Sequence, residues 1–327
     1  MDFVPEDGLD GMAGPPTILL RDVSRKIIVT NDSPDIGFKA SINPYRGCEH
    51  GCVYCYARPT HEYLGFSSGL DFETQILVKE AAPQLLREEL SSRSWRPQVI
   101  AMSGVTDAYQ PIEKHLRLTR ACLEVLTEFR NPVAVITKNH LITRDVDLLQ
   151  ELARYNAAAV FVSVTTLDSA LARRMEPRAS QPDRRLDTIR CLKEAGVPVG
   201  VMVAPVVPAL TDHELPVILE RAARAGAESA GFVLMRLPFA VKELFTRWLE
   251  QYFPERKDKV LNRIRALRDG ELNDPRFKSR MRGEGVFAQQ IQAMFDTTCR
   301  RLGLPQREWH LSTASFRRPG GKQLELL

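Results

Sequence analysis

The stretch Arg46-Gly-Cys-Glu-His-Gly-Cys-Val-Tyr-Cys-Tyr56 predicts a metal-binding loop. It places Cys48, Cys52 and Cys55 within eight residues and uses half of the chain's six cysteines. A closed tetrahedral zinc site needs a fourth ligand, and no fourth cysteine follows nearby. Three thiolates on one short loop suit an iron–sulfur cluster in which one iron has no protein ligand.

The bulk composition is that of a globular protein. The 327 residues suffice for one large domain or two ordinary ones, and the hydrophobic fraction of 44% allows a substantial core. No apolar run approaches the roughly 18 residues that span a bilayer, so no membrane partner is expected. Residues 1–16 carry four acidic side chains and no basic one, unlike a secretory or mitochondrial signal. Together with the cysteine usage, this indicates a reducing cytoplasm.

The first part of the chain predicts an arm outside the main fold. Residues 1–17 are rich in Gly, Pro and acid and are expected to be flexible. The β-prone segment 17–30 precedes a turn and predicts a hairpin or an extended arm. Residues 39–43 predict a short strand that runs into the cysteine loop. Residues 72–79 form another β-like run, expected outside the main sheet.

Beyond this point, short apolar strands alternate with amphipathic helices. The expected strands are 98–103, 133–137, 159–164, 198–204 and 230–235. The expected helices are 113–129, 145–155, 168–175, 182–195, 212–225 and 239–252. Asp145 is an expected N-cap, and Thr211 and Glu214 have the spacing of a capping box. Continuous apolar strands that alternate with helices predict a parallel sheet with about six βα units, an α/β partial (β/α)6 TIM-like barrel.

Three regions are expected from these patterns. Residues 1–36 would form the N-terminal β arm and residues 37–252 the barrel. Residues 253–327 would form a basic, mainly helical C-terminal extension. Within it, residues 255–282 contain ten Lys and Arg against five Asp and Glu, and a helix is expected over 286–302. The basic stretch suits either a phosphate-binding surface or a solvated helix face.

Polar side chains follow the strands, where parallel α/β folds bind their ligands. Ser103, Thr106 and Asp107 follow the strand 98–103, and Lys138 follows the strand 133–137. Ser163 ends the strand 159–164. This convergence places candidate binding groups on the same edge of the sheet as the cysteine loop.

Several segments resemble one known family. These are RGCEHGCVYCYAR, VTDAYQPIEK, ITKNHLITRD, SVTTLD with the later EPR, and APVVPALTD. They are similar to the radical S-adenosylmethionine (SAM) enzymes related to spore photoproduct lyase, a group often labelled DNA-repair-photolyase-like, over roughly residues 44–237. The resemblance implies a radical SAM barrel, a 4Fe–4S cluster and SAM. It also implies that one electron cleaves SAM to methionine and a 5′-deoxyadenosyl radical, which abstracts hydrogen from a substrate.

The resemblance also implies roles for individual residues. The three cysteines would ligate the cluster, with a zinc knuckle as the alternative. The implied SAM contacts are Tyr54 beside the adenine, Ser103, Thr106 and Asp107 at the methionine amino group, Lys138 at the carboxylate, and Ser163 at the ribose or carboxylate. Alternatives remain open: a solvated Lys138, Asp107 as a helix cap, and Ser163 satisfied by the backbone.

Three residues are candidates on the substrate side. Glu176 and Arg178 could face the substrate or hold each other. Tyr109 could relay a radical or simply pack, and packing is favoured. The loop 103–107 lacks the cysteine with which spore photoproduct lyases return hydrogen to the product, which argues against thymine-dimer repair by that route.

Two hypotheses from different classes follow. The first is a radical SAM enzyme with an unidentified substrate and an electron donor of the reduced flavodoxin or ferredoxin type. The second is a nucleic-acid-binding protein whose metal loop is structural. The net charge of +4 permits DNA or RNA as a partner under either hypothesis.

Overall fold

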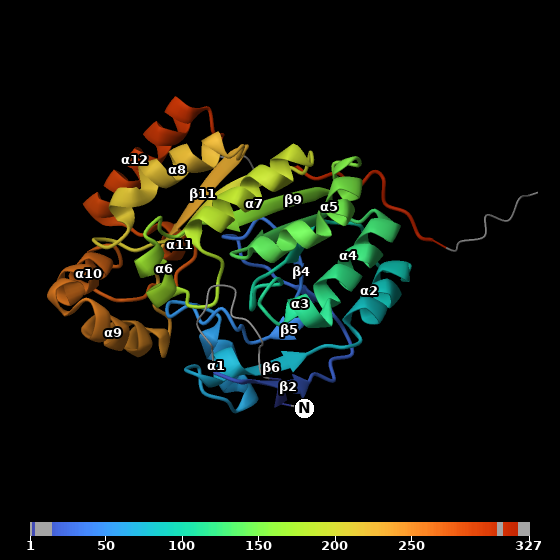
Figure 1. Cartoon of the computed structure of the whole chain (residues 1–327), viewed down its shortest axis with the longest axis horizontal. Coiled ribbons are helices and arrows are strands. Elements are labelled where there is room, and N and C mark those ends of the chain that lie inside the picture. Colours follow the sequence, from blue (N-terminus) through green and yellow to red (C-terminus); the bar gives the residue numbers. More distant parts are fainter. Residues whose placement is uncertain (1, 4–14, 306–309, 320–327) are drawn as a thin grey trace, which may run out of the picture.

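The computed structural model describes residues 2–3, 15–305 and 310–319, and the expected flexibility of residues 1–17 falls largely outside these ranges. The main sheet has the strand order β11-β10-β9-β8-β7-β4-β3 (Figure 1). In chain order, its strands are β3 (Ile28–Thr30), β4 (Ala40–Ile42), β7 (Ile100–Met102), β8 (Val133–Thr137), β9 (Ala158–Ser163), β10 (Val199–Val206) and β11 (Ser229–Leu234).

Six strands of this sheet, β4 and β7 to β11, run parallel, and β3 runs antiparallel beside β4. Paired residues such as Val135 of β8 and Val160 of β9 are both fully buried. Apolar strands of this kind are covered on both faces, which is why they lack an alternating pattern. The expected α/β partial barrel is confirmed.

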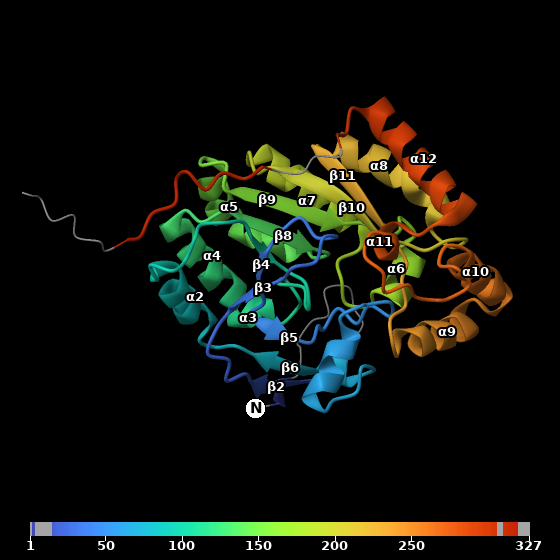
Figure 2. The same ribbon diagram turned by 180° about the vertical axis from the view of Figure 1, so that it is seen from behind.

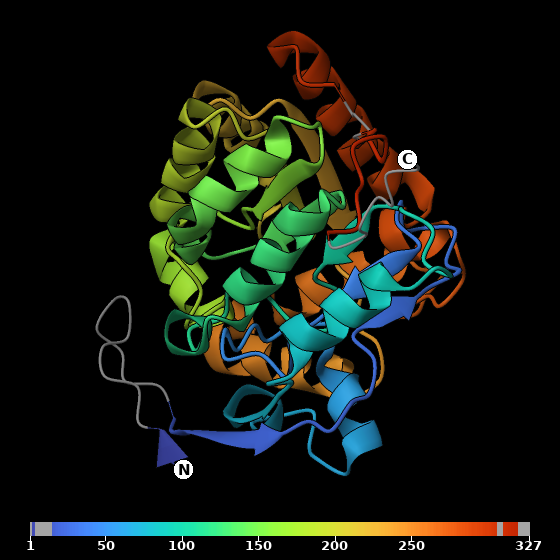
Figure 3. The same cartoon turned by 90° about the vertical axis from the view of Figure 1, so that its right-hand side faces the viewer.

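Four helices cover the outer face of the sheet (Figures 1 and 3). They are α4 (Leu118–Phe129), α5 (Val146–Ala153), α7 (Pro182–Glu194) and α8 (Leu215–Arg224). Their inward side chains, such as Leu126, Leu149 and Ile189, are fully buried in one apolar core with the strands. This burial fixes each helix against the sheet, so the connections at the carboxyl ends of the strands are held in place.

A second sheet lies below the barrel in Figure 1 and has the order β1-β2-β6-β5. Its strands are β1 (Asp2–Phe3), β2 (Thr17–Arg21), β5 (Tyr45–Arg46) and β6 (Gln75–Val78). The β-like run 72–79 therefore does lie outside the main sheet, although its first half forms the short helix α1 (Asp71–Thr74). Of the hairpin or extended arm expected over 17–30, the hairpin is excluded, because β2 pairs with β6 whereas β3 pairs with β4.

The helix expected over 113–129 is broken in two. The short helix α3 (Glu113–Leu116) ends before α4, and Arg117 between them has a left-handed φ of 54°. The Glu113 carboxylate accepts hydrogen bonds from the backbone amides of Thr119 (3.0 Å) and Arg120 (3.3 Å). Because this buried side chain satisfies two free amides of the first turn of α4, a new helix starts there.

Asp145 occupies the expected N-cap position of α5, but neither it nor the pair Thr211 and Glu214 makes the expected capping hydrogen bonds, because other partners take the side chains. Asp145 precedes α5 but makes no capping hydrogen bond; its carboxylate pairs instead with Arg120 (3.0 Å) and Arg144 (2.7 Å). The capping box expected at Thr211 and Glu214 is also absent. The Thr211 hydroxyl accepts from the Val207 amide, and the Glu214 carboxylate accepts from the Leu167 amide.

The remaining helices surround the barrel. They are the 3₁₀ helices η1 (Arg58–Leu64), η2 (His140–Asp145) and η3 (Asp212–Glu214), and the α-helices α2 (Ala82–Ser91), α6 (Ser169–Met175), α9 (Val241–Tyr252), α10 (Pro254–Ala266), α11 (Ser279–Arg282) and α12 (Gly285–Leu302). Figure 2 shows α12 beside α8, and α9 and α10 together at one side of the barrel. None of the helices in the described part of the chain combines the length and apolar composition needed to cross a membrane.

Candidate functional site

The cysteine loop follows β4 and β5, beyond the carboxyl end of the first parallel strand. Cys48 and Cys52 are buried, and Cys55 is half-buried. The Cys48 amide donates to the carbonyl of Phe72 in α1 (2.9 Å), and the Val53 amide donates to the carbonyl of Met175 in α6 (3.0 Å). The loop backbone is therefore fixed from two sides.

The Arg58 side chain binds the backbone of the cysteine loop, a role that was not predicted from the sequence. Its guanidinium is nearly fully buried and donates to the carbonyls of Cys52 (2.9 Å) and Gly51 (3.1 Å). It also donates to two carbonyls of the segment 68–69 and pairs with Glu73. Only the rigid fork of an arginine supplies so many donors in fixed directions. The sole signal in the sequence is its place directly after the cysteine motif.

Gly47 is required where it stands. Its φ of +85° lies in the left-handed region that glycine adopts at low cost. An added Cβ would meet His61 Cε1 and Ile76 Cδ1 at 2.9 Å and the Phe72 carbonyl oxygen at 3.0 Å. The backbone before Cys48 can therefore approach α1 and β6 only without a side chain at this position.

The three thiols fit an iron–sulfur cluster by their chemistry. All three are free of disulfides, and they form an all-sulfur set on one loop. Burial, together with the nearby Asp107 carboxylate, raises the pKa of the Cys48 thiol to about 12, so a bound cluster must displace its proton. Among the described residues, no three Cys, His, Asp or Glu side chains are gathered closely enough to hold one metal ion.

A buried carboxylate organises the side chains next to the loop. Glu176 accepts hydrogen bonds from the hydroxyls of Tyr54 and Thr165, and its other oxygen pairs with Arg185. The Lys138 ammonium lies 3.8 Å from the same carboxylate and 5.9 Å from the centre of the Tyr54 ring. Burial opposes ionisation of Glu176, but Arg185 and Lys138 outweigh it and lower the pKa to about 2. The structure thus brings Tyr54, Lys138 and Glu176 together.

Asp107 joins the ends of two neighbouring strands. One carboxylate oxygen accepts from the Tyr109 amide (2.9 Å) and the Thr137 hydroxyl (2.7 Å), and the other accepts from the Lys138 amide (2.8 Å). The bond to Tyr109 is local, whereas α3 begins only at Glu113, so Asp107 is not a helix cap. The side chain instead fixes the backbone that presents Lys138.

The other predicted SAM contacts lie on the same edge. The buried Thr106 hydroxyl donates to the Gly47 carbonyl (2.6 Å), so it supports the cysteine loop directly. Ser103 is half-buried directly after β7. Ser163 is buried at the end of β9, and its carbonyl accepts from Arg185 (3.1 Å).

The substrate-side candidates Glu176, Arg178 and Tyr109 do not form one group in the structure. Arg178 donates to the Glu49 carbonyl and pairs with Glu73 (2.6 Å), so Arg178 and Glu176 do not hold each other. Tyr109 is fully buried in the main apolar core, away from solvent.

The structure adds three residues that the sequence did not single out for this site. Arg185 pairs with Glu176, and His50 lies between Asn139 (3.1 Å) and Asp107 (3.5 Å). Burial lowers the pKa of His50 to about 4. Arg236, directly after β11, places its guanidinium 4.8 Å from the ring centre of the half-exposed Tyr56, which follows Cys55. No local pattern identifies these residues: the partners of His50 and Arg236 lie far away in the sequence, and Arg185 and Glu176 lie on either side of a loop between two helices.

Comparisons with known proteins agree with this geometry. Residues 42–222, more than half of the chain, match the family model described as the radical SAM superfamily. An uncharacterized protein of Mycobacterium tuberculosis is 37% identical over 248 residues, which cover 75% of this chain and 72% of that protein. An uncharacterized protein of Methanocaldococcus jannaschii is 30% identical over 227 residues, which cover 69% of this chain and 81% of that protein.

Solved structures show the same fold. Spore photoproduct lyase complexed with dinucleoside spore photoproduct matches with a TM-score of 0.60 and 17% identity, over 88% of this chain and 80% of that chain. A mutant of that lyase matches with a TM-score of 0.61 and 18% identity, with the same coverage. At this identity the likeness establishes the fold alone.

Proposed function

Because this chain belongs to the radical SAM superfamily of enzymes, we propose that Cys48, Cys52 and Cys55 hold a 4Fe–4S cluster whose open iron binds SAM. Once reduced by an external one-electron donor, the cluster would supply the electron that cleaves SAM to methionine and a 5′-deoxyadenosyl radical, and that radical would take hydrogen from the substrate. One observation carries the proposal: three free thiols share one loop with Tyr54, and Lys138 lies beside that tyrosine ring at the carboxyl ends of the strands.

The chain's own residues would bind and orient SAM. Lys138 offers a positive charge to the SAM carboxylate, and Asp107 fixes the backbone from which Lys138 extends. Tyr54 offers its ring to the adenine, with its hydroxyl held by Glu176. Ser103, Thr106 and Ser163 would complete the binding edge. Ser103 and Ser163 would contact SAM directly, whereas Thr106 also supports the loop through Gly47.

The substrate is unidentified, with DNA or RNA as a candidate, and the electron donor would be a reduced flavodoxin or ferredoxin in the cytoplasm. The lyase that shares this fold was solved with a dinucleoside, and a related phage protein, 24% identical over 185 residues, is a radical SAM Nalpha-GlyT isomerase. That match covers 56% of this chain and 36% of the phage protein. Since the loop 103–107 contains no cysteine, hydrogen would return to the product by another route than in spore photoproduct lyase.

The chain would consist of the three regions that the sequence predicts. Residues 37–252 would form the radical SAM barrel, with residues 1–36 as its N-terminal arm. Residues 253–327 would form a basic, mainly helical C-terminal extension.

Anaerobic purification tests the cluster. The protein should be brown, with about four irons and four sulfides per chain, as a 4Fe–4S centre requires. With dithionite, it should convert SAM to 5′-deoxyadenosine, and Cys52→Ala should abolish both the iron and the product. Cys191→Ala is the matched control, because Cys191 lies on α7, outside the loop.

The rival hypothesis of a structural metal loop makes the opposite prediction. A colourless protein that contains zinc and leaves SAM intact under dithionite would refute the enzyme proposal. Retention of iron and turnover by Cys52→Ala would show that the cluster lies elsewhere.

A further inference from the structure

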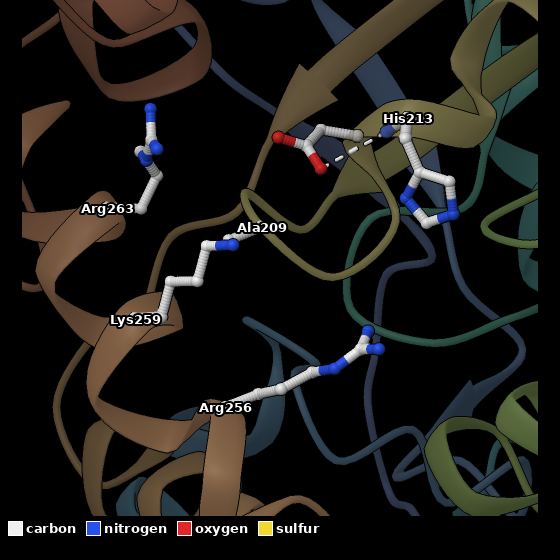
Figure 4. Close-up of a pocket in the computed structure, with 6 residues that line it drawn as sticks. Ala209, His213, Arg256, Lys259 and Arg263 are labelled. Carbon is white, nitrogen blue, oxygen red and sulfur yellow. Dashed lines mark hydrogen bonds between the residues drawn. The ribbon is translucent and has the colours of Figure 1, made fainter.

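A cavity of about 400 Å³ lies between α10 and the loop that follows β10 (Figure 4). Its walls are formed by Ala209, Asp212, His213, Arg256, Lys259 and Arg263. Figure 4 shows Arg256 and Lys259 extending from α10 toward the loop that carries Ala209 and His213. The volume falls within the range of about 300–1,000 Å³ typical of small-ligand sites.

Arg256, Lys259 and Arg263 lie on one face of α10 because of their spacing in the sequence. Positions 256, 259 and 263 are three and four residues apart, which places them on one side of a helix. The neighbouring side of α10 buries Val260, Leu261 and Ile264 in an apolar cluster. Because this apolar side is packed, the helix cannot rotate to turn its cations away from the pocket.

These positive charges are not neutralised locally. Arg256 lies 3.9 Å from Glu255, and both side chains are more than half exposed, so this ion pair is weak. Lys259 has no ion-pair partner among the residues that the structure describes. Arg263 places its guanidinium 3.4 Å from the ring centre of Phe287 on α12, which fixes it without cancelling its charge.

One carboxylate, that of Asp212, also lines the pocket. It accepts a hydrogen bond from the His213 amide (3.1 Å) and forms no ion pair with the cations within the described part of the chain. Three cations against one carboxylate leave the pocket with an excess of positive charge. Such a site favours an anion that carries more than one oxygen acceptor.

The elements that form the pocket and the cysteine loop pack against one apolar cluster. Val207 and Leu210, on the β10 loop between the strand and the pocket, pack in the same apolar cluster as Cys52 and Tyr54. The buried side chains of α10 belong to that cluster as well. A ligand bound to α10 is therefore connected to the cysteine loop through packed apolar side chains.

We propose that this pocket binds a phosphate ester of the substrate and thereby presents an adjoining part of the substrate to the cysteine loop. The Arg256 guanidinium can give two parallel hydrogen bonds to phosphate oxygens, and the Lys259 ammonium adds a mobile point charge. Arg263, stacked on the Phe287 ring, adds positive charge to the wall of the pocket. The cavity exceeds a single phosphate group, so an attached sugar fits beside it. Phosphate binding itself is independent of the proposed radical reaction; only the presentation to the loop rests on it.

The test is a binding measurement on the full chain, purified anaerobically. Inorganic pyrophosphate and thymidine monophosphate are titrated by calorimetry, and a fluorescein-labelled single-stranded oligonucleotide is titrated by anisotropy. The double variant Arg256→Gln/Lys259→Gln should bind at least tenfold more weakly than the wild type. Its slope of log affinity against log salt should be shallower by about one unit per lost cation.

Two further variants sharpen the test. Lys257→Gln/Arg265→Gln removes two positive charges from the same helix but none from the pocket, because Lys257 pairs with Glu250 and Arg265 with Asn262. This control should bind within about twofold of the wild type. Asp212→Asn keeps the bond to the His213 amide and removes a negative charge, so it should bind phosphate more tightly.

The outcomes separate the source of the phosphate and can overturn the proposal. Binding of all three probes indicates a small phosphorylated substrate, and binding of the oligonucleotide alone indicates a nucleic-acid strand. Three results would contradict phosphate binding by this pocket: absence of binding at low salt, equal weakening of binding in the control variant, or no gain of phosphate affinity in Asp212→Asn. Melting curves verify that each variant is folded. Because binding is measured without turnover, its failure is distinct from a failure to cleave SAM.

Discussion

Arg185 and Glu176 form an ion pair in which both side chains are almost completely buried. The other donors of Arg185 reach the carbonyls of Ser163 (3.1 Å) and Ser180 (2.6 Å). The pair therefore ties α7 to the end of β9 and fixes the carboxylate that receives the Tyr54 hydroxyl. A side chain that never reaches the cysteine loop thus determines how one residue of that loop is held.

Replacing Arg185 should destabilise the protein strongly. Arg185→Met leaves the Glu176 carboxylate buried without its main cationic partner, which costs about 3–5 kcal/mol in comparable buried pairs. Urea unfolding measures the loss. Arg190→Met is the control on the same helix, since the Arg190–Asp187 pair is exposed and worth less than about 1 kcal/mol. Equal losses in the two variants would contradict a special role for the buried pair.

Glu176 should make stability depend on acid pH. Its pKa is lowered from 4.5 to about 2 in the folded protein, so its contribution is present above about pH 4.5 and is lost as pH falls toward 2. The stability gap between the wild type and Glu176→Gln should shrink over this window by about 3 kcal/mol, as an order of magnitude. Unfolding of both proteins at a series of pH values measures this gap. Loss of iron at acid pH affects both proteins equally, so it does not change the difference between them. A gap that stays constant would contradict the prediction.

Arg58 should control whether the loop can hold a cluster. Arg58→Met removes donors to the carbonyls of Cys52 and Gly51 and leaves Glu73 without one of its two arginines. We expect at least a twofold loss of iron per chain and about 3 kcal/mol or more of stability, since buried carbonyls lose their partners. Arg58→Lys should recover only part of both, because an ammonium lacks the planar fork. Arg247→Met, which breaks an exposed pair with Glu243, should retain full iron content.

Gly47→Ala should be more harmful than Gly65→Ala. Both glycines have a left-handed φ, so alanine is strained at each position by about 1–2 kcal/mol. At Gly65 an added Cβ meets nothing within 4 Å, whereas at Gly47 it would strike His61, Ile76 and the Phe72 carbonyl. We expect Gly47→Ala to lose about 1–3 kcal/mol more in denaturant unfolding, together with some of its iron. Equal effects would show that the space around Gly47 is not limiting.

Elements with local signals could be predicted from the sequence alone. The spacing of Cys48, Cys52 and Cys55 identified the loop, and the apolar runs identified five of the six parallel strands, the sixth being the short strand expected at 39–43. The sequence also placed Lys138 and Ser163 at strand ends, because a parallel sheet puts those ends on one edge. Such patterns can be recognised in a single sequence, since the burial of a strand or helix depends on residues close to one another in sequence.

The partner of each polar side chain, in contrast, became visible only in the three-dimensional fold. Glu214 has the spacing of a helix cap, yet it bonds to the amide of Leu167, 47 residues earlier. Glu113 stops one helix and starts another, and β2 and β3 separate into different sheets. The basic face of α10 became a pocket only because the loop after β10 lies opposite. A buried charge or amide needs a hydrogen-bonding partner, and the fold can supply that partner from any part of the chain. Local sequence therefore does not identify it.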